Sequence, residues 1–242
     1  EEMNRRIAGA IATLHFAPTE QAQRNLLDEG VDQRAVHVTG NTVIDALLQV
    51  VKQLHSDPAL SSRMTQCFQF LDNHKRLILV TGHRRENFGA GFENICTALR
   101  QISQRDDVEI VYPVHLNPNV QEPVNRRLSD RSNVHLIAPL DYLPFVYLMN
   151  KAHILITDSG GVQEEAPSLG KPVLVMRDTT ERPEALAAGT VKLVGTDPQA
   201  IIAATAQLLD DTTEYQTMSQ AHNPYGDGLA APRIIALLQN QP

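Results

Sequence analysis

Short apolar segments with strand character alternate with helix-compatible segments along most of this chain. Residues 76–80 and 153–156 are two of these apolar segments. Strands that alternate with helices form a parallel sheet with helices on both faces. The sequence therefore predicts an α/β fold with a Rossmann-like, doubly wound parallel sheet. The expected strands cover residues 76–80, 108–112, 134–137, 153–156, 172–176 and 191–194.

The remaining pattern predicts the other elements. Thr19 is the expected N-cap of a helix that runs to about residue 29, and Gly30 is its expected stop. The polar residues 55–62 predict a loop or a linker between domains, and residues 177–184 predict a loop. Short strands are expected at 15–17 and 36–38, and the other expected helices cover 1–14, 43–54, 92–103, 142–150, 198–210 and 230–238.

Composition limits the class of protein. The chain has 242 residues, 42% of them hydrophobic, which is enough for one large or two small globular domains. A net charge of -7 argues against nucleic acid as the main partner, because phosphate backbones select basic surfaces. Cys67 and Cys96 lack metal-site spacing and need not pair, which favours a reducing cytoplasm. Neither a signal peptide nor a membrane span is predicted.

Polar segments follow four of the predicted strands. They cover residues 81–87, 114–119, 157–161 and 177–184. In a parallel sheet, ligands bind beyond the carboxyl ends of the strands. We therefore expect these segments to meet at one edge of the sheet and to form one site.

The segment 157–167 follows a strand and leads into a helix that Pro167 limits. Gly160 and Gly161 allow a ligand to approach the backbone, and the start of a helix favours an anion such as phosphate. Glu165 lies one helical turn after Gly161, where its carboxylate can take the ribose hydroxyls of a nucleotide. Glu164 points about 100° away and is expected to be solvated. The alternative is a strand–helix connection without a ligand.

Histidine and arginine residues add candidates for chemistry. His83 follows a strand, where an imidazole can bind phosphate or act as acid or base, or can merely order its loop. His115 repeats this arrangement after the next strand. Arg84 and Arg85 are suited to phosphate, although one of them can instead pair with Glu86.

The loop at 177–184 is dense in charge. Arg182 is a candidate for a diphosphate contact, because a guanidinium matches phosphate geometry. Glu181 and Glu184 are alternative, structural partners of the arginines. Phe145 can stack on a base, although a position in the core is favoured.

Two nucleotide-binding motifs are absent from the sequence. No Gly-x-Gly-x-x-Gly follows a strand, and no Walker-type Gly-Lys-Ser/Thr occurs. Neither a dinucleotide cofactor nor P-loop hydrolysis is therefore indicated.

Taken together, these motifs resemble the bacterial, non-hydrolysing UDP-N-acetylglucosamine 2-epimerases, with the enterobacterial common-antigen type most similar. The resemblance spans nearly the whole chain. It is carried by EEMNR at residues 1–5, TGNTVID at 39–45, TGHRREN at 81–87, DSGGVQEEAPSLGKP at 158–172 and RDTTERPE at 177–184.

This resemblance implies a two-domain fold of the glycosyltransferase-B type with the active site in the cleft. It implies interconversion of UDP-GlcNAc and UDP-ManNAc without cofactor or metal. By motif, His83 and Glu1 are catalytic, and Arg84 and His115 belong to a regulatory UDP-GlcNAc site. The substrate-binding residues by motif are Phe145, Ser159, Gly160, Gly161, Glu165 and Arg182.

The resemblance also predicts the domain organisation. The chain starts without methionine and within a helical pattern, so we expect a fragment that lacks most of the first domain. Residues 1–40 would end that domain, 41–220 would form the UDP-binding domain, and 221–242 would pack back on the first domain. We expect this fragment alone to be inactive and the full-length enzyme to be a homodimer without nucleic-acid or membrane partners. A UDP-sugar glycosyltransferase, a hydrolysing epimerase and a non-catalytic nucleotide-sugar sensor are the alternatives.

Overall fold

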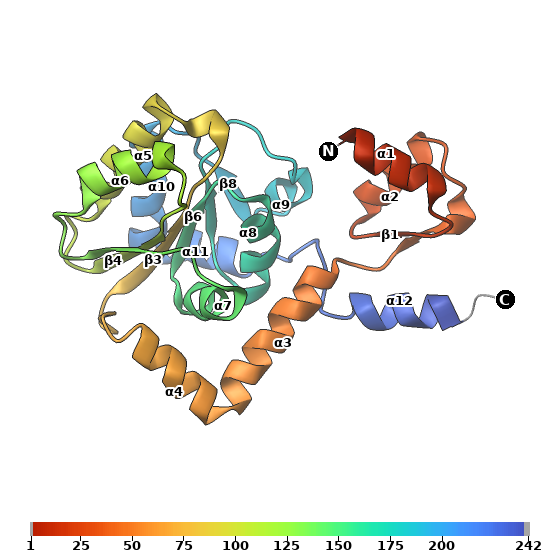
Figure 1. Ribbon diagram of the computed structural model, residues 1–242, viewed down its shortest axis with the longest axis horizontal. Coiled ribbons are helices and arrows are strands. Elements are labelled where there is room, and N and C mark those ends of the chain that lie inside the picture. Colours follow the sequence, from red (N-terminus) through yellow and green to blue (C-terminus); the bar gives the residue numbers. More distant parts are fainter. Residues whose placement is uncertain (1, 240–242) are drawn as a thin grey trace. The chain divides into compact units, whose positions relative to one another are not determined.

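The computed structural model describes residues 2–239 and divides the chain into two compact units (Figure 1). One unit contains the chain up to Gln49 together with the segment from Pro224 onward. The other contains Val50–Asn223. The roles that the sequence predicts for residues 1–40, 41–220 and 221–242 stay predictions.

The larger unit is built on a six-stranded sheet in which every neighbouring pair is parallel. Its order is β5-β4-β3-β6-β7-β8, so the chain turns back at the β3–β6 pair in the middle of the sheet. This arrangement confirms the predicted doubly wound α/β fold. The strands are β3 (Arg76–Thr81), β4 (Val108–Pro113), β5 (Val134–Ile137), β6 (Ile154–Thr157), β7 (Val173–Val175) and β8 (Val191–Leu193).

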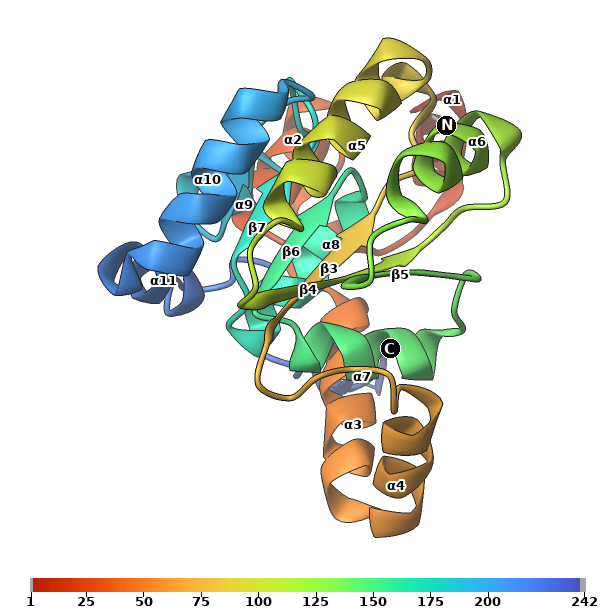
Figure 2. The ribbon, with the colours of Figure 1, turned by 90° about the vertical axis from the view of Figure 1, so that its left-hand side faces the viewer.

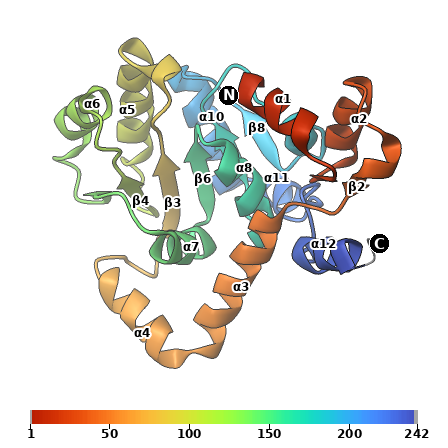
Figure 3. The same cartoon turned by 45° about the vertical axis from the view of Figure 1, so that its right-hand side comes forward.

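Helices cover both faces of this sheet (Figure 2). On one face α5 (Ala90–Ile102), α6 (Pro118–Leu128) and α10 (Pro198–Asp210) pack on the strands, and α5 lies against α10 (Figure 3). On the other face lies α7 (Tyr142–Lys151). The short elements are η2 (Arg85–Asn87), α8 (Gly160–Glu165), η3 (Ala166–Leu169), α9 (Pro183–Ala187) and α11 (Thr212–Ser219).

The core explains why these strands read as continuous apolar runs. Ile78 and Ile110 are fully buried at the centre of the sheet, and Phe92 on α5 is fully buried against them. Strands of a parallel sheet are buried on both faces and therefore carry few alternating polar residues. This burial holds the carboxyl ends of the strands rigidly in place.

The prediction of a loop or linker over residues 55–62 is wrong. Helix α3 (Thr42–Ser56) ends there and α4 (Pro58–Cys67) begins two residues later. The Asp57 carboxylate accepts hydrogen bonds from Ala59 N and Leu60 N, and Pro58 occupies the first turn. An Asp-Pro pair is therefore a helix start here, since proline at the first turn loses no hydrogen bond.

Two other helices were not expected. Asp211 caps α11 through the amide groups of Thr213 and Glu214. Helix α9 begins at Pro183, within the predicted loop over residues 177–184. Both begin with a polar cap or a proline, and such residues also favour turns, so local sequence alone is ambiguous.

The smaller unit contains a two-stranded parallel sheet of β1 (His15–Ala17) and β2 (Val36–Val38). Thr19 caps α2 through Ala22 N, and Gly30 has a φ of 88°, as the sequence predicts. The Asp45 carboxylate accepts the first amides of the C-terminal helix α12. The other elements are α1 (Glu2–Ile11), α2 (Glu20–Asp28), η1 (Gln33–Ala35) and α12 (Ala230–Gln239).

A membrane-spanning helix is not found among the described residues 2–239, since none of their helices is sufficiently long and apolar.

Candidate functional site

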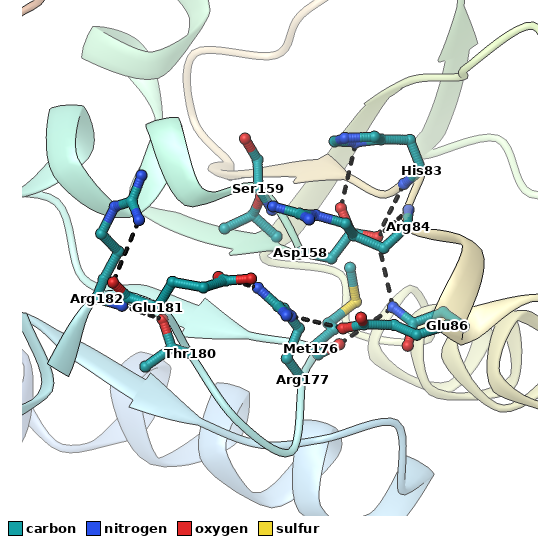
Figure 4. Close-up of polar contacts among 12 residues, drawn as sticks. His83, Arg84, Glu86, Asp158, Ser159, Met176, Arg177, Thr180, Glu181 and Arg182 are labelled. Carbon is teal, nitrogen blue, oxygen red and sulfur yellow. Dashed lines mark hydrogen bonds and ion pairs between the residues drawn. The ribbon is translucent and has the colours of Figure 1, made fainter. Parts of the chain in front are cut away.

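The segments that follow β3, β6 and β7 meet at the carboxyl edge of the sheet (Figure 4). Asp158, at the end of β6, is completely buried and joins them. Its Oδ2 accepts hydrogen bonds from His83 N at 2.9 Å and Arg84 N at 2.8 Å. Asn87 Nδ2, which also binds the Met176 carbonyl, lies 3.4 Å from the same oxygen. Three of the four polar segments therefore meet at one edge of the sheet, as the sequence predicts.

His83 lies above this buried carboxylate. Its Nδ1 is 3.3 Å from Asp158 Oδ1, and 43% of its side chain is exposed. The imidazole stacks on that of His115, with ring centroids 5.8 Å apart. The structure thus brings together two predicted residues from the ends of β3 and β4.

Gly82 is required by close packing beneath this histidine. A Cβ at this position would lie 2.8 Å from Tyr112 Oη and 3.3 Å from Phe92. Tyr112 Oη donates a hydrogen bond to the Gly82 carbonyl at 3.3 Å, and burial raises the pKa of this phenol. The core therefore fixes the backbone that carries His83.

The turn that opens α8 lies against Arg182. A Cβ at Gly160 would lie 3.4 Å from the Arg182 guanidinium, so this glycine lets the cation approach the backbone. Gly161 is exposed, and Ser159 lies beside it with its amide bonded to Thr157 Oγ1 at 2.9 Å. Because α8 has only six residues, its dipole is limited, and the Arg182 guanidinium brings a full positive charge to the turn.

The prediction that Glu164 is solvated is wrong. Its side chain is only 12% exposed and forms an ion pair with Arg182. The loop before α9 folds over this face of α8, where Thr180 Oγ1 donates to Gln163 Oε1 at 2.6 Å. Helical periodicity cannot register a loop from elsewhere in the chain.

Arg177 has a structural role in this loop. It is 7% exposed, donates to Glu86 Oε1 at 2.6 Å and also bonds Glu181. The Glu181 bond raises the pKa of Arg177, and Arg177 lowers the pKa of Glu181 to about 2. The sequence offered Arg84 or Arg85 as the partner of Glu86, whereas in the structure Glu86 pairs with Arg177.

Glu165 is buried and has a hydrogen-bond partner that the sequence did not predict. Tyr142 Oη donates to Glu165 Oε1 at 2.6 Å. Burial raises the pKa of Glu165, while the Tyr142 hydrogen bond acts against this shift. Phe145 lies one turn along α7 from Tyr142. It is half-buried, so the core position that the sequence favoured for it is wrong. The shared helical face of Tyr142 and Phe145 was the available signal.

Glu1 lies outside the described residues. Within residues 2–239, histidine, cysteine and carboxylate side chains form no group of three or more that is suited to a metal ion.

The sequence matches a known protein family and several of its members. A model of the family "UDP-N-acetylglucosamine 2-epimerase" matches residues 1–239. A protein of Ralstonia nicotianae called a probable UDP-N-acetylglucosamine 2-epimerase is 62% identical over 99% of this chain and 64% of its own length. The Escherichia coli K12 protein of that name is 60% identical, with the same shares of the two chains covered.

Solved structures agree. The Neisseria meningitidis UDP-GlcNAc 2-epimerase bound to UDP-GlcNAc has a TM-score of 0.94 and 50% identity, over 100% of this chain and 65% of that one. The Methanocaldococcus jannaschii enzyme in complex with UDP-GlcNAc and UDP has a TM-score of 0.80 and 32% identity over the same shares. This chain thus spans about 64% of the length of its curated relatives. On the match over residues 1–239, the chain belongs to the UDP-N-acetylglucosamine 2-epimerase family.

Proposed function

We propose that this chain forms the UDP-binding part of an enzyme that interconverts UDP-GlcNAc and UDP-ManNAc by inversion at C2. The observation that carries the proposal is the position of His83 on the buried Asp158, at the same sheet edge as the Arg182–Gly160 contact. An imidazole thus shares one edge of the sheet with a guanidinium that lies against the backbone of the α8 turn. The Neisseria relative, with 50% identity, was solved with UDP-GlcNAc.

In this proposal Arg182 and the backbone at Gly160 and Gly161 bind the diphosphate. Ligand binding requires Arg182 to exchange or share its bond to Glu164, since both acceptors compete for one guanidinium. Ser159 borders the same turn. The diphosphate is the leaving group, so the same contacts stabilise the charge that develops in the reaction.

Glu165 and Phe145 would bind the uridine. The Glu165 carboxylate is held by Tyr142 and takes the ribose hydroxyls, while half-buried Phe145 lies near the uracil. Within the described part of the chain no cation pairs with the buried Glu165 carboxylate, and such an unfavourable arrangement is typical of a ligand-binding group.

We expect Glu165→Gln to weaken UDP binding by about 1–3 kcal/mol, the range for hydrogen bonds to charged groups. Calorimetry with UDP measures this. Glu109→Gln is the matched control, because Glu109 is equally buried but bonds Asp72 N and His135. Unchanged affinity in Glu165→Gln would remove Glu165 from the site.

The same variant has a second expected result, in stability. Because the folded-state pKa of Glu165 is raised above 4.5, its stabilising contribution is full at low pH and is lost as pH rises through the folded pKa. Glu165→Gln should therefore raise the melting temperature at about pH 7. The gain should shrink as the pH falls and vanish well below the ordinary Glu pKa of about 4.3, where the carboxyl is neutral in both states.

The chemistry proposed is elimination followed by re-addition. A base takes the C2 proton while the C1–O bond breaks and its electron pair leaves with UDP, which gives a glycal. UDP then forms a new bond to C1, and a proton reaches C2 from the opposite face. His83 is one acid or base at this site, and Glu1 is proposed as another.

An isotope experiment tests this reaction in the full-length protein, meaning a polypeptide of the relatives' length that contains this chain. Incubation with UDP-GlcNAc in deuterated water should place deuterium at C2 of UDP-ManNAc. The reason is that the acid/base side chain exchanges with solvent and returns a deuteron to C2. An oxygen label at the bridging position of the sugar phosphate should scramble as C1–O breaks and re-forms. Conversion with neither label would contradict elimination.

The alternatives predict other products in that incubation. A glycosyltransferase transfers the sugar only when an acceptor is added, a hydrolysing epimerase releases free ManNAc and UDP, and a sensor leaves the substrate unchanged. The geometry favours none of these, because fold alone does not decide reaction class.

The remaining proposals concern regulation and context. Arg84 and His115 are proposed for a second, regulatory UDP-GlcNAc site, and the stacking of His115 on His83 would couple that site to the catalytic one. We further propose a homodimer in the cytoplasm that supplies ManNAc units for surface polysaccharide or common antigen. The cysteines are free, with Cys96 buried.

A further inference from the structure

The two carboxylate oxygens of Asp158 have different surroundings. Oδ2 accepts the amides of His83 and Arg84 and lies near Asn87 Nδ2. Oδ1 is buried and has no hydrogen-bond partner among the described residues. His83 Nδ1 lies 3.3 Å from it, as an ion-pair contact. One oxygen is thus saturated by the turn and the other faces the imidazole.

An unpartnered carboxylate oxygen in a buried position is unfavourable, so its presence calls for a donor. A small rotation of the exposed His83 ring converts the 3.3 Å contact into a hydrogen bond from Nδ1–H. The His115 ring, stacked on His83, leaves that rotation within the ring plane possible. Neighbouring Arg84, whose Nε is also buried and bonds none of residues 2–239, adds positive charge at this point.

We propose that Asp158 is the positioning residue of His83, which keeps the imidazole proton on Nδ1 and leaves Nε2 as the nitrogen that faces the ligand. A carboxylate that accepts from one ring nitrogen determines which nitrogen carries the proton. The expected effect of Asp158 on kcat rests on the proposed function. The expected tautomer of His83 does not depend on that function.

A purely structural role for Asp158 would use Oδ2 alone. In that case Asp158 would order the turn at His83 and Arg84, and the tautomer of His83 would not depend on Oδ1. Asp158→Asn separates the two roles. The asparagine oxygen can still accept the two backbone amides, while its NH2 group replaces Oδ1 and offers a donor to His83 Nδ1.

The first test is 15N NMR of the 242-residue chain at about pH 8.5, well above the ordinary histidine pKa of about 6.5. The chain has nine histidines, so His83 is assigned by comparison with His83→Asn. We expect the Nδ1–H tautomer in the wild type and the Nε2–H tautomer in Asp158→Asn. A wild-type ring in the Nε2–H form would overturn the proposal even if Asp158→Asn fails to fold.

The second test is kinetic and uses the full-length protein. Asp158→Asn should lower kcat about ten- to hundredfold with KM for UDP-GlcNAc nearly unchanged. This is the usual effect of losing a residue that orients a functional histidine. Asn87→Ala is the control, because it removes the contact to Oδ2 and the bond to the Met176 carbonyl but leaves Oδ1 and His83 in place. It should lower the melting temperature while the His83 tautomer stays the same.

The outcomes are distinguishable. An equal loss of kcat in Asn87→Ala and Asp158→Asn, with an unchanged tautomer in both, would leave Asp158 as a turn residue and overturn the proposal. A wild-type protein without epimerase activity would contradict the proposed function, while the tautomer test would still decide the role of Asp158.

Discussion

Replacing His83 with asparagine should lower kcat of the full-length protein by about 10²- to 10⁴-fold, the range for losing a general acid or base. Stability should change little, because the side chain is 43% exposed and contacts mainly Asp158 and His115. Asparagine keeps a polar group of similar reach but does not titrate. Turnover on UDP-GlcNAc and thermal melting of the same preparations measure the two effects.

His153→Asn is the matched control for this variant. His153 lies just before β6, at the amino end of the strand that carries Asp158 at its other end, and its ring stacks on Tyr215 with centroids 4.1 Å apart. Burial lowers the pKa of His153 to about 4, so it is neutral at physiological pH. We expect the control to lower the melting temperature and to leave kcat unchanged. Normal turnover in His83→Asn, or simple unfolding, would assign His83 to loop structure instead.

Replacing Phe92 with alanine should destabilise the larger unit by about 3–5 kcal/mol. Phe92, on α5, is fully buried against the sheet; its ring packs on Phe88 and lies so near Gly82 that a Cβ there would be 3.3 Å away. The loss combines the transfer free energy of the ring with the cavity that remains. Because Gly82 precedes His83, a cavity here should also loosen the segment that carries His83.

The matched control is Phe70→Ala. Phe70 is 38% exposed and contacts the His135 ring at 4.5 Å, so its loss should cost less than half as much. The chain has no tryptophan, so far-UV circular dichroism follows urea unfolding. Hydrogen exchange of β3 and β4 amides reports on the larger unit separately, since two units need not unfold together. Equal losses in the two variants would show that burial at Phe92 does not set the stability.

The sequence alone determined the strands and the edge at which the site forms. Segments such as β5 and α10 were predicted to the residue, because their apolar runs and caps are local signals. The turn at Gly160 followed from a glycine pair after a strand. The convergence of residues 81–87 and 157–161 followed from parallel topology, since carboxyl ends of parallel strands share one edge, but the sequence did not single out Asp158.

Local signals did not separate helix starts from loops. Asp57 and Asp211 cap helices in segments that were predicted as a loop or received no prediction. The same residue types stabilise turns and helix N-termini, and the difference lies in what the following residues pack against. That information is not contained in a short window of sequence.

Only the tertiary structure decided which charges pair. Arg177, Arg182 and Glu164 have the same local signals as freely solvated side chains, yet the fold gives Arg177 to Glu86 and Glu181 and places Glu164 on Arg182. Likewise, the Tyr142–Glu165 bond and the open oxygen of Asp158 depend on strands and helices that are far apart in the chain. The physical reason is that propensity and periodicity act over a few residues, whereas partner choice and burial are set by packing between distant segments.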